Sequence, residues 1–99
     1  SAPMLMGDPL LGKSDALLEA YVRDTNMWVR RIGVVATWRF ILKGHFGTTM
    51  RLCTDLLKDP EDLMHKACGW MLREVGKKDE KVLVAYLDKH APQMPRTML

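Results

Sequence analysis

The sequence predicts an all-α fold, an α-solenoid in which helical hairpins stack in about two to three repeats. Apolar residues recur at spacings of three and four, whereas the period-two alternation of a half-buried strand is absent over any useful length. Aligning the stretch from Asp24 with the stretch from Asp59 gives a period of 35 residues. Such a period, built from helix pairs, is typical of solenoids, because one pair cannot cover its own apolar face. We therefore expect residues 1–99 to form a single segment of helical repeats.

The expected helices follow from the apolar spacing and from residues suited to helix ends. We expect helices over residues 15–23, 27–43, 48–58, 60–78 and 80–89. Ser14 and Asn26 are suitable N-caps for the first two helices, because their side chains accept hydrogen bonds from backbone N–H groups of the first turn. A further short helix within residues 1–12 would be broken at Gly7 and Gly12.

The later helices have clearer boundaries. Gly44 ends the helix over 27–43, since glycine readily takes the left-handed conformation found at helix ends. The helix over 60–78 has the clearest signals at its ends. Asp59 is its expected cap, Pro60 fits its first position, and two lysines are suited to the negative, C-terminal end of the helix dipole. Pro92 limits the last helix.

Composition narrows the functional class. The longest runs without a charged residue are seven residues long, which excludes a membrane span and a signal peptide, so we expect a cytoplasmic protein. Two cysteines and three separated histidines lack the spacing of a metal site, and we expect neither a metal nor a cofactor. The net charge of +3 is concentrated in residues 25–58, which carry six cations and one anion. This asymmetry favours a polyanionic partner.

One face of the helix over 60–78 carries an unusual combination of side chains. Lys66, Trp70, Arg73 and Lys77 follow one another at i, i+4, i+7 and i+11 and so form one stripe, while the apolar residues occupy the opposite side. Large aromatic side chains are usually buried, so a tryptophan among cations suggests a binding role. The alternative is a tryptophan partly covered by lysine and arginine stems, with cation–π contacts of about 0.5–1 kcal/mol each.

The 35-residue period extends the positive charge across repeats. It relates Lys66 to Arg31, and a third, incomplete copy starting near Met94 contains Arg96. Neighbouring helices pack about 8–10 Å apart, so these three side chains would form a cationic column suited to a phosphate backbone. The alternative is a solvated face whose charge is partly offset by Glu74 or Asp62.

Three phrases of the sequence resemble the AlkD-like DNA alkylation repair enzymes, which are DNA glycosylases built on HEAT-like helical repeats. The phrases are Asn26–Ile32, His65–Lys77 and Lys89–Thr97. The resemblance covers essentially the whole chain and matches a later part of the family domain. It implies that the helical hairpins are HEAT-like and that residues 1–99 are a segment of a longer DNA alkylation repair domain, a view that the Ser1 start and Leu99 end also favour.

The resemblance implies a parent enzyme that excises positively charged N3- or N7-alkylated purines from double-stranded DNA. Members of the family use two tryptophans, an aspartate and a backbone-binding arginine; Trp70 matches one of the tryptophans, as a catalytic residue, and Arg31 matches the arginine. The second tryptophan and the aspartate have no counterpart here, so the segment alone is expected to excise bases poorly. The further expected DNA-binding residues are Lys66, Arg73, Arg30, Lys77 and Arg96.

Other interpretations stay open. A non-catalytic helical-repeat scaffold that binds protein or nucleic acid would explain the architecture but not the tryptophan in the stripe. Incomplete repeats would also expose apolar ends and favour a homodimer. His65 is expected to be a surface or hydrogen-bonded histidine, and Cys68, on the apolar side of its helix, an inert buried thiol.

Overall fold

The computed structural model describes residues 9–99, and the side chains of residues 16–99. Its elements are α1 (Pro9–Val22), α2 (Met27–Ala36), α3 (Trp38–Leu42), α4 (Gly47–Asp55), α5 (Asp62–Lys78), α6 (Glu80–His90) and the short 3-10 helices η2 (Ala91–Gln93) and η3 (Arg96–Met98). No strand occurs among these residues. The predicted all-α class is confirmed.

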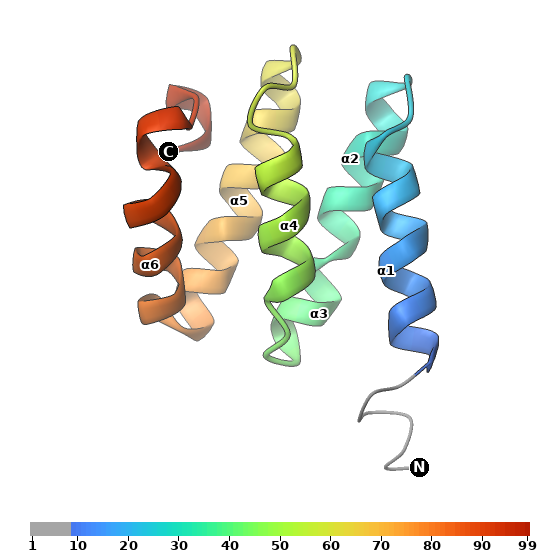
Figure 1. Ribbon diagram of the computed structural model, residues 1–99, viewed down its shortest axis with the longest axis horizontal. Coiled ribbons are helices and arrows are strands. Elements are labelled where there is room, and N and C mark those ends of the chain that lie inside the picture. The colour runs from blue at the N-terminus through green and yellow to red at the C-terminus, as the bar shows by residue number, and fades with distance from the viewer. Residues whose placement is uncertain (1–8) are drawn as a thin grey trace.

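The helices form two layers (Figure 1). Helices α1, α4 and α6 lie in one layer, and α2, α3 and α5 lie behind them. The described chain is only 17 Å deep along its shortest axis, which fits two layers of helices packed about 8–10 Å apart. Within the second layer α2 packs against α5, and α5 packs against η3. The first residues of α2 and α5 are 35 positions apart, as the sequence period predicts.

The core lies between the layers. It consists of apolar side chains from α1 to η3, and the most completely buried are Val34, Ile41, Leu52, Cys53, Met64, Cys68, Met71 and Val75. Burying such side chains supplies about 1.5–3 kcal/mol each for the larger ones, so this seam stabilises the pairing of the layers. Among the helices of residues 9–99, none has the length and apolarity needed to cross a bilayer.

The first helix is longer than predicted. Helix α1 begins at Pro9, so Gly12 does not break it and Ser14 lies inside it rather than capping it. Proline is compatible with a first turn, and a glycine inside a helix costs about 1 kcal/mol, which packing of α1 against α2 readily offsets. The expected break at Gly7 lies outside the described residues.

The predicted helix over 27–43 is divided at Thr37. The Thr37 hydroxyl, fully buried, donates to the carbonyl of Val34 at 2.6 Å, and its backbone N–H bonds the same carbonyl at 3.1 Å in the tighter i→i−3 pattern. Both predicted ends are confirmed. The Asn26 side chain accepts from the Trp28 N–H at 2.8 Å, and Gly44 has a φ of +82°.

The start of α5 differs from the prediction. The helix begins at Asp62, with Glu61 at the cap position, so Pro60 precedes it and Asp59 does not cap it. The Asp59 carboxylate instead accepts from the Glu61 N–H at 2.9 Å and forms an ion pair with Arg30. Both oxygens of Asp59 are thus engaged ahead of the first residue of α5.

Replacing Gly69 by alanine should loosen the C-terminal end of the chain. An added Cβ would lie 2.6 Å from the Met98 carbonyl oxygen, so η3 would have to move off α5. We expect a loss of about 1–3 kcal/mol in the free energy of unfolding, measured with urea, despite a helix-propensity gain of about 1 kcal/mol. Gly76→Ala is the control, because its added Cβ meets the flexible side chain of Leu83. Equal stabilities of the two variants would contradict the prediction.

Candidate nucleic-acid interface

Helix α5 has two distinct faces, as its sequence predicts. The side toward the core contains the buried residues Met64, Ala67, Cys68, Met71, Leu72 and Val75. On the opposite side Lys66, Trp70, Arg73 and Lys77 are exposed, and Trp70 keeps 40% of its surface accessible to solvent. We call these four residues the α5 stripe. The prediction that Trp70 lies outside the core is therefore confirmed, and an accessible indole shares one face of the helix with three cations.

Trp38 extends the aromatic character of this surface from α3. Its indole N–H donates to Glu74 Oε1 at 3.2 Å, and the ammonium of Lys77 donates to Glu74 Oε2 at 2.9 Å. The sequence analysis missed this contact, although Trp38 and Glu74 are 36 residues apart, close to one repeat. It joins α3 to α5 on the side of the helices that carries the stripe.

Glu74 is the carboxylate that partly balances the α5 stripe. The Lys77 ammonium and the Trp38 indole N–H lower the pKa of Glu74 from its ordinary value of 4.5, with a smaller contribution from the charge of Arg73. Glu74 is therefore ionised at neutral pH, and both of its oxygens are held by hydrogen bonds. The expectation that Glu74 offsets part of the charge holds, but the stripe keeps an excess of positive charge.

The bond between Trp38 and Glu74 should titrate at unusually low pH. A depressed pKa in the folded state means that the contribution of Glu74 to stability is present above its unfolded pKa and is lost as the pH falls through its folded pKa. We expect the Nε1–H signal of Trp38 in an NMR titration from about pH 7 to pH 3 to move with a midpoint below 4.5. The Trp28 indole, which has no hydrogen-bond partner among the described residues, is the control. A midpoint at or above 4.5 would contradict this assignment.

Arg30 has a structural role that the sequence analysis did not anticipate. Its guanidinium donates from Nε to Asp59 Oδ2 at 2.9 Å and from Nη2 to Asp59 Oδ1 at 3.3 Å. Its Nη1 donates to the backbone carbonyls of Asp24 and Thr25, at 3.0 Å each. Four of its five N–H groups are thus engaged within the protein, and its side chain is 11% exposed. Arg30 therefore connects the start of α2 to the turn before α5, and little of it is accessible to a phosphate.

Arg31 lies on the solvent side of α2. It is the fifth residue of α2, as Lys66 is of α5, and these adjacent helices run in the same direction (Figure 1). The two cations are therefore at matching positions in adjacent repeats. Arg31 is half-buried because its stem lines an open apolar groove with Trp28, Ile32, Val35 and Ala36.

Arg96 is exposed at the start of η3, within the stretch predicted to begin a third copy of the repeat. This turn is held against α5 by a hydrogen bond from the Thr97 hydroxyl to Asp62 at 2.9 Å, and by the buried side chain of Met98. Arg31, Lys66 and Arg96 thus come from three elements that pack in sequence, with α5 in the middle.

His65 and Cys68 lie on the inner side of α5. His65 is only 8% exposed, and its ring nitrogens have no hydrogen-bond partner among the residues that the structure describes. The prediction of a surface or hydrogen-bonded histidine is therefore wrong. Its nearest charge is the Asp62 carboxylate, 3.5 Å from Nδ1. The predicted burial of Cys68 is confirmed: it is fully buried and unbridged. A hydrogen bond with Cys68 and burial raise the pKa of the Cys53 thiol well above its ordinary value.

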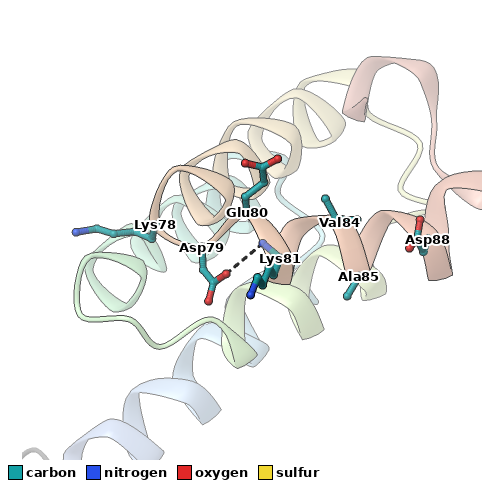
Figure 2. Close-up of a pocket in the computed structure, with 7 residues that line it drawn as sticks. All are labelled: Lys78, Asp79, Glu80, Lys81, Val84, Ala85 and Asp88. Carbon is teal, nitrogen blue, oxygen red and sulfur yellow. Dashed lines mark hydrogen bonds between the residues drawn. The ribbon is translucent and has the colours of Figure 1, made fainter.

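A wide hollow of about 830 Å³ opens elsewhere, at the turn between α5 and α6 (Figure 2). It is lined by Lys78, Asp79, Glu80, Lys81, Val84, Ala85 and Asp88. The Asp79 carboxylate accepts from the backbone N–H of Lys81 at 3.1 Å and caps α6. Three carboxylates against two ammonium groups leave this hollow without excess positive charge, so it is not suited to phosphate.

The fold and this surface define an all-α protein of paired helices that presents a cationic, tryptophan-containing face. The sequence model of the family described as DNA alkylation repair enzyme matches residues 1–99. The chain belongs to that family. A search of curated proteins and a search of solved structures each gave no significant match.

Proposed function

We propose that this chain supplies part of the DNA-binding face of a glycosylase that removes positively charged N3- or N7-alkylated purines. The observation that supports this best is the position of Trp70, exposed among Lys66, Arg73 and Lys77 on the side of α5 opposite the core. A packed domain gains little from an accessible indole in that place. Membership of the DNA alkylation repair enzyme family makes DNA the partner to expect.

The cations suit the backbone of a duplex. In this proposal Arg31, Lys66 and Arg96 contact successive phosphates, while Arg73 and Lys77 add charge near the damaged nucleotide. The planar guanidinium of arginine binds phosphate oxygens through two parallel hydrogen bonds, and lysine acts as a point charge. Binding of this kind releases counterions and is therefore weakened by salt.

Trp70 is the residue proposed to act on the lesion. A purine alkylated at N3 or N7 carries positive charge and is already a good leaving group, so the protein has to hold the nucleotide and stabilise the charge that develops on the sugar. The face of an indole attracts a cation through the ring quadrupole. Trp70, exposed in the stripe, is thus chemically suited to lie beside the base or the sugar.

The 99 residues by themselves should bind methylated duplex DNA but release methylated bases slowly. No aspartate of this chain matches the catalytic aspartate expected from the family resemblance. We expect release of 7-methylguanine, followed by chromatography, to stay within about twofold of the spontaneous rate in a control without protein. Release far above that rate, abolished by Trp70→Ala, would show that the chain is catalytically complete. Failure to bind any duplex at low salt would contradict the proposed function.

A second candidate is a helical-repeat scaffold that binds protein. The groove on α2 favours it, because Trp28 and Ile32 are 59% and 56% exposed there beside Val35 and Ala36. Exposed apolar surface of this kind is common at protein interfaces. The two candidates differ in one property: a protein-binding groove has no affinity for a duplex, whereas the proposed DNA-binding face loses affinity steeply as salt rises.

A further inference from the structure

One edge of the two layers is apolar and open to solvent. Helices α1 and α2 form this edge (Figure 1). Among the described residues four large apolar side chains are more than half exposed, and three of them, Leu17, Trp28 and Ile32, come from these two helices. Their exposed fractions are 53%, 59% and 56%. Exposed apolar side chains gathered in one place are typical of a protein interface.

Helix α5 shows which side of a helix its preceding neighbour covers. Glu74 accepts the hydrogen bond of Trp38 from α3, so its side of α5 faces the preceding pair of helices. Met71 and Ala67 precede Glu74 by three and seven residues and therefore share that side. They are 0% and 2% exposed. Because α2 and α3 both pack against α5, these two helices bury this side of α5.

The same side of α2 is open. The 35-residue period relates Ala67 and Met71 of α5 to Ile32 and Ala36 of α2. Ile32 is 56% exposed, whereas Ala67 is 2% exposed. Trp28 precedes Ile32 by about one turn and lines the same open groove as Ile32 and Ala36. Helix α2 therefore presents to solvent the side that a neighbouring helix buries in α5.

Helix α1 continues this open side in the other layer. Glu19 forms an ion pair with α4 at 3.1 Å, so its side of α1 faces α4. Leu17 precedes Glu19 by two residues, about 160° around the helix, and therefore points away from α4. A Cβ added to Gly33 would lie 3.2 Å from the carbonyl oxygen of Leu18, so α1 and α2 are in close contact there. Leu17 and Ile32, each next to a residue of this contact, lie at nearly the same height on the edge.

The open side of α2 is complementary to itself in shape. It has a bulky side chain near one end, Trp28, a small one at the other end, Ala36, and Ile32 midway between them. If two copies of α2 pack antiparallel about Ile32, each Trp28 lies opposite Ala36 of the second copy. Large side chains opposite small ones pack closely, and twofold symmetry makes each such contact occur twice.

The charges at the two ends are complementary in the same arrangement. Asp24 precedes Ile32 by eight residues and Arg39 follows it by seven, and both are exposed. The period relates Arg39 to Glu74, the residue on the side of α5 that faces the preceding helices, so Arg39 lies on the open side. Antiparallel pairing brings Asp24 of one copy beside Arg39 of the other. Opposite charges at the rim of an interface favour one register over others.

We propose that the face formed by Leu17, Trp28, Ile32 and Ala36 is an interface with a second copy of this chain, paired antiparallel about a twofold axis at Ile32. In this dimer α2 packs beside α2 and α1 beside α1, so each layer continues across the axis. The α5 stripe lies outside the interface. The inference is thus independent of the proposed function.

The size of the face predicts a weak dimer. Helix α1 has 14 residues and is about 21 Å long, and the described chain is 17 Å deep. A face of these dimensions is smaller than the roughly 800 Å² per partner of a standard interface. We therefore expect a dissociation constant on the order of 100 µM.

Sedimentation equilibrium of the unmodified chain, from about 10 µM to about 1 mM, measures this association. Ile32→Glu places two carboxylates at the axis and should weaken association about tenfold or more. Val84→Glu is the matched control, because Val84 is 46% exposed on α6, away from the proposed interface. It should keep the dissociation constant within about twofold. Circular dichroism verifies that both variants are folded.

A charge exchange tests the antiparallel register. Asp24→Arg and Arg39→Asp should each weaken association about fivefold or more, and the two combined should restore it to within about twofold of the unmodified chain. Within one chain α2, with 10 residues and about 15 Å of length, separates these side chains, so the rescue requires two copies. A chain that stays monomeric up to 1 mM, an unchanged dissociation constant in folded Ile32→Glu, or a charge exchange without rescue would overturn the proposal.

Discussion

Replacement of Arg30 by alanine should lower the free energy of unfolding by about 3 kcal/mol. The variant leaves the Asp59 carboxylate, only 6% exposed, without its ion-pair partner. Removing one member of a buried pair costs about 3–5 kcal/mol, and this pair keeps slight access to water. The carbonyls of Asp24 and Thr25 also lose their donor. For a domain of this size we expect the melting temperature to fall by about 12–24 °C, measured by circular dichroism.

Two comparisons test this prediction. Glu19→Ala removes a more exposed ion pair, with Arg51, and should cost less than about 1 kcal/mol. The double variant of Arg30→Ala with Asp59→Ala should be more stable than the sum of the single effects predicts, because it leaves no carboxylate without a partner. A loss below about 1 kcal/mol in Arg30→Ala, or strict additivity in the double variant, would contradict the structural role of Arg30.

Replacing Lys66 and Arg73 together by glutamine should weaken duplex binding at least tenfold, about 1.4 kcal/mol, at fixed low salt. Both side chains are exposed on the α5 stripe, so the substitutions remove charge without disturbing the core. Hydrogen bonds to charged groups contribute about 1.5–3 kcal/mol each, which makes tenfold a lower bound for two phosphate contacts. Fluorescence anisotropy of a labelled duplex measures the affinity.

The matched control removes two lysines from α6 in the other layer, by Lys81→Gln and Lys89→Gln. Both are exposed, and the control has the same formal net charge as the Lys66 and Arg73 variant, because each loses two cations. We expect it to keep duplex affinity within about threefold. Equal losses in the two double variants would mean that overall charge, rather than the α5 stripe, determines binding.

Helical periodicity was sufficient to predict which side chains of one helix face the core and which face the solvent. The two faces of α5 follow from spacing alone, because the helix is long and regular and its apolar residues share one side. The N-cap at Asn26 and the left-handed conformation of Gly44 were also predictable, because each depends only on the local backbone and the residue type. The 35-residue period likewise recurs in the starts of α2 and α5.

Contacts between helices could not be predicted from spacing. Asp59 is a residue type that often caps helices, but here its carboxylate is paired with Arg30, which is 29 residues away in the sequence. Trp38 and Glu74 meet only because α3 packs against α5. His65 is adjacent in the sequence to an exposed lysine, yet its side chain is buried in the folded chain. Each of these outcomes depends on tertiary packing, which overrides local preference.

The salt dependence of duplex binding tests the central claim most directly. Affinity for an undamaged duplex is measured over a range of KCl concentrations, for the unmodified chain and for the Lys66→Gln, Arg73→Gln variant. If the α5 stripe contacts phosphates, log K falls linearly with log salt, and the variant reduces the slope by about 0.9 per lost contact, or about 1.8 in total. An unmodified chain that shows no salt-dependent binding, or a variant with an unchanged slope, would contradict the account.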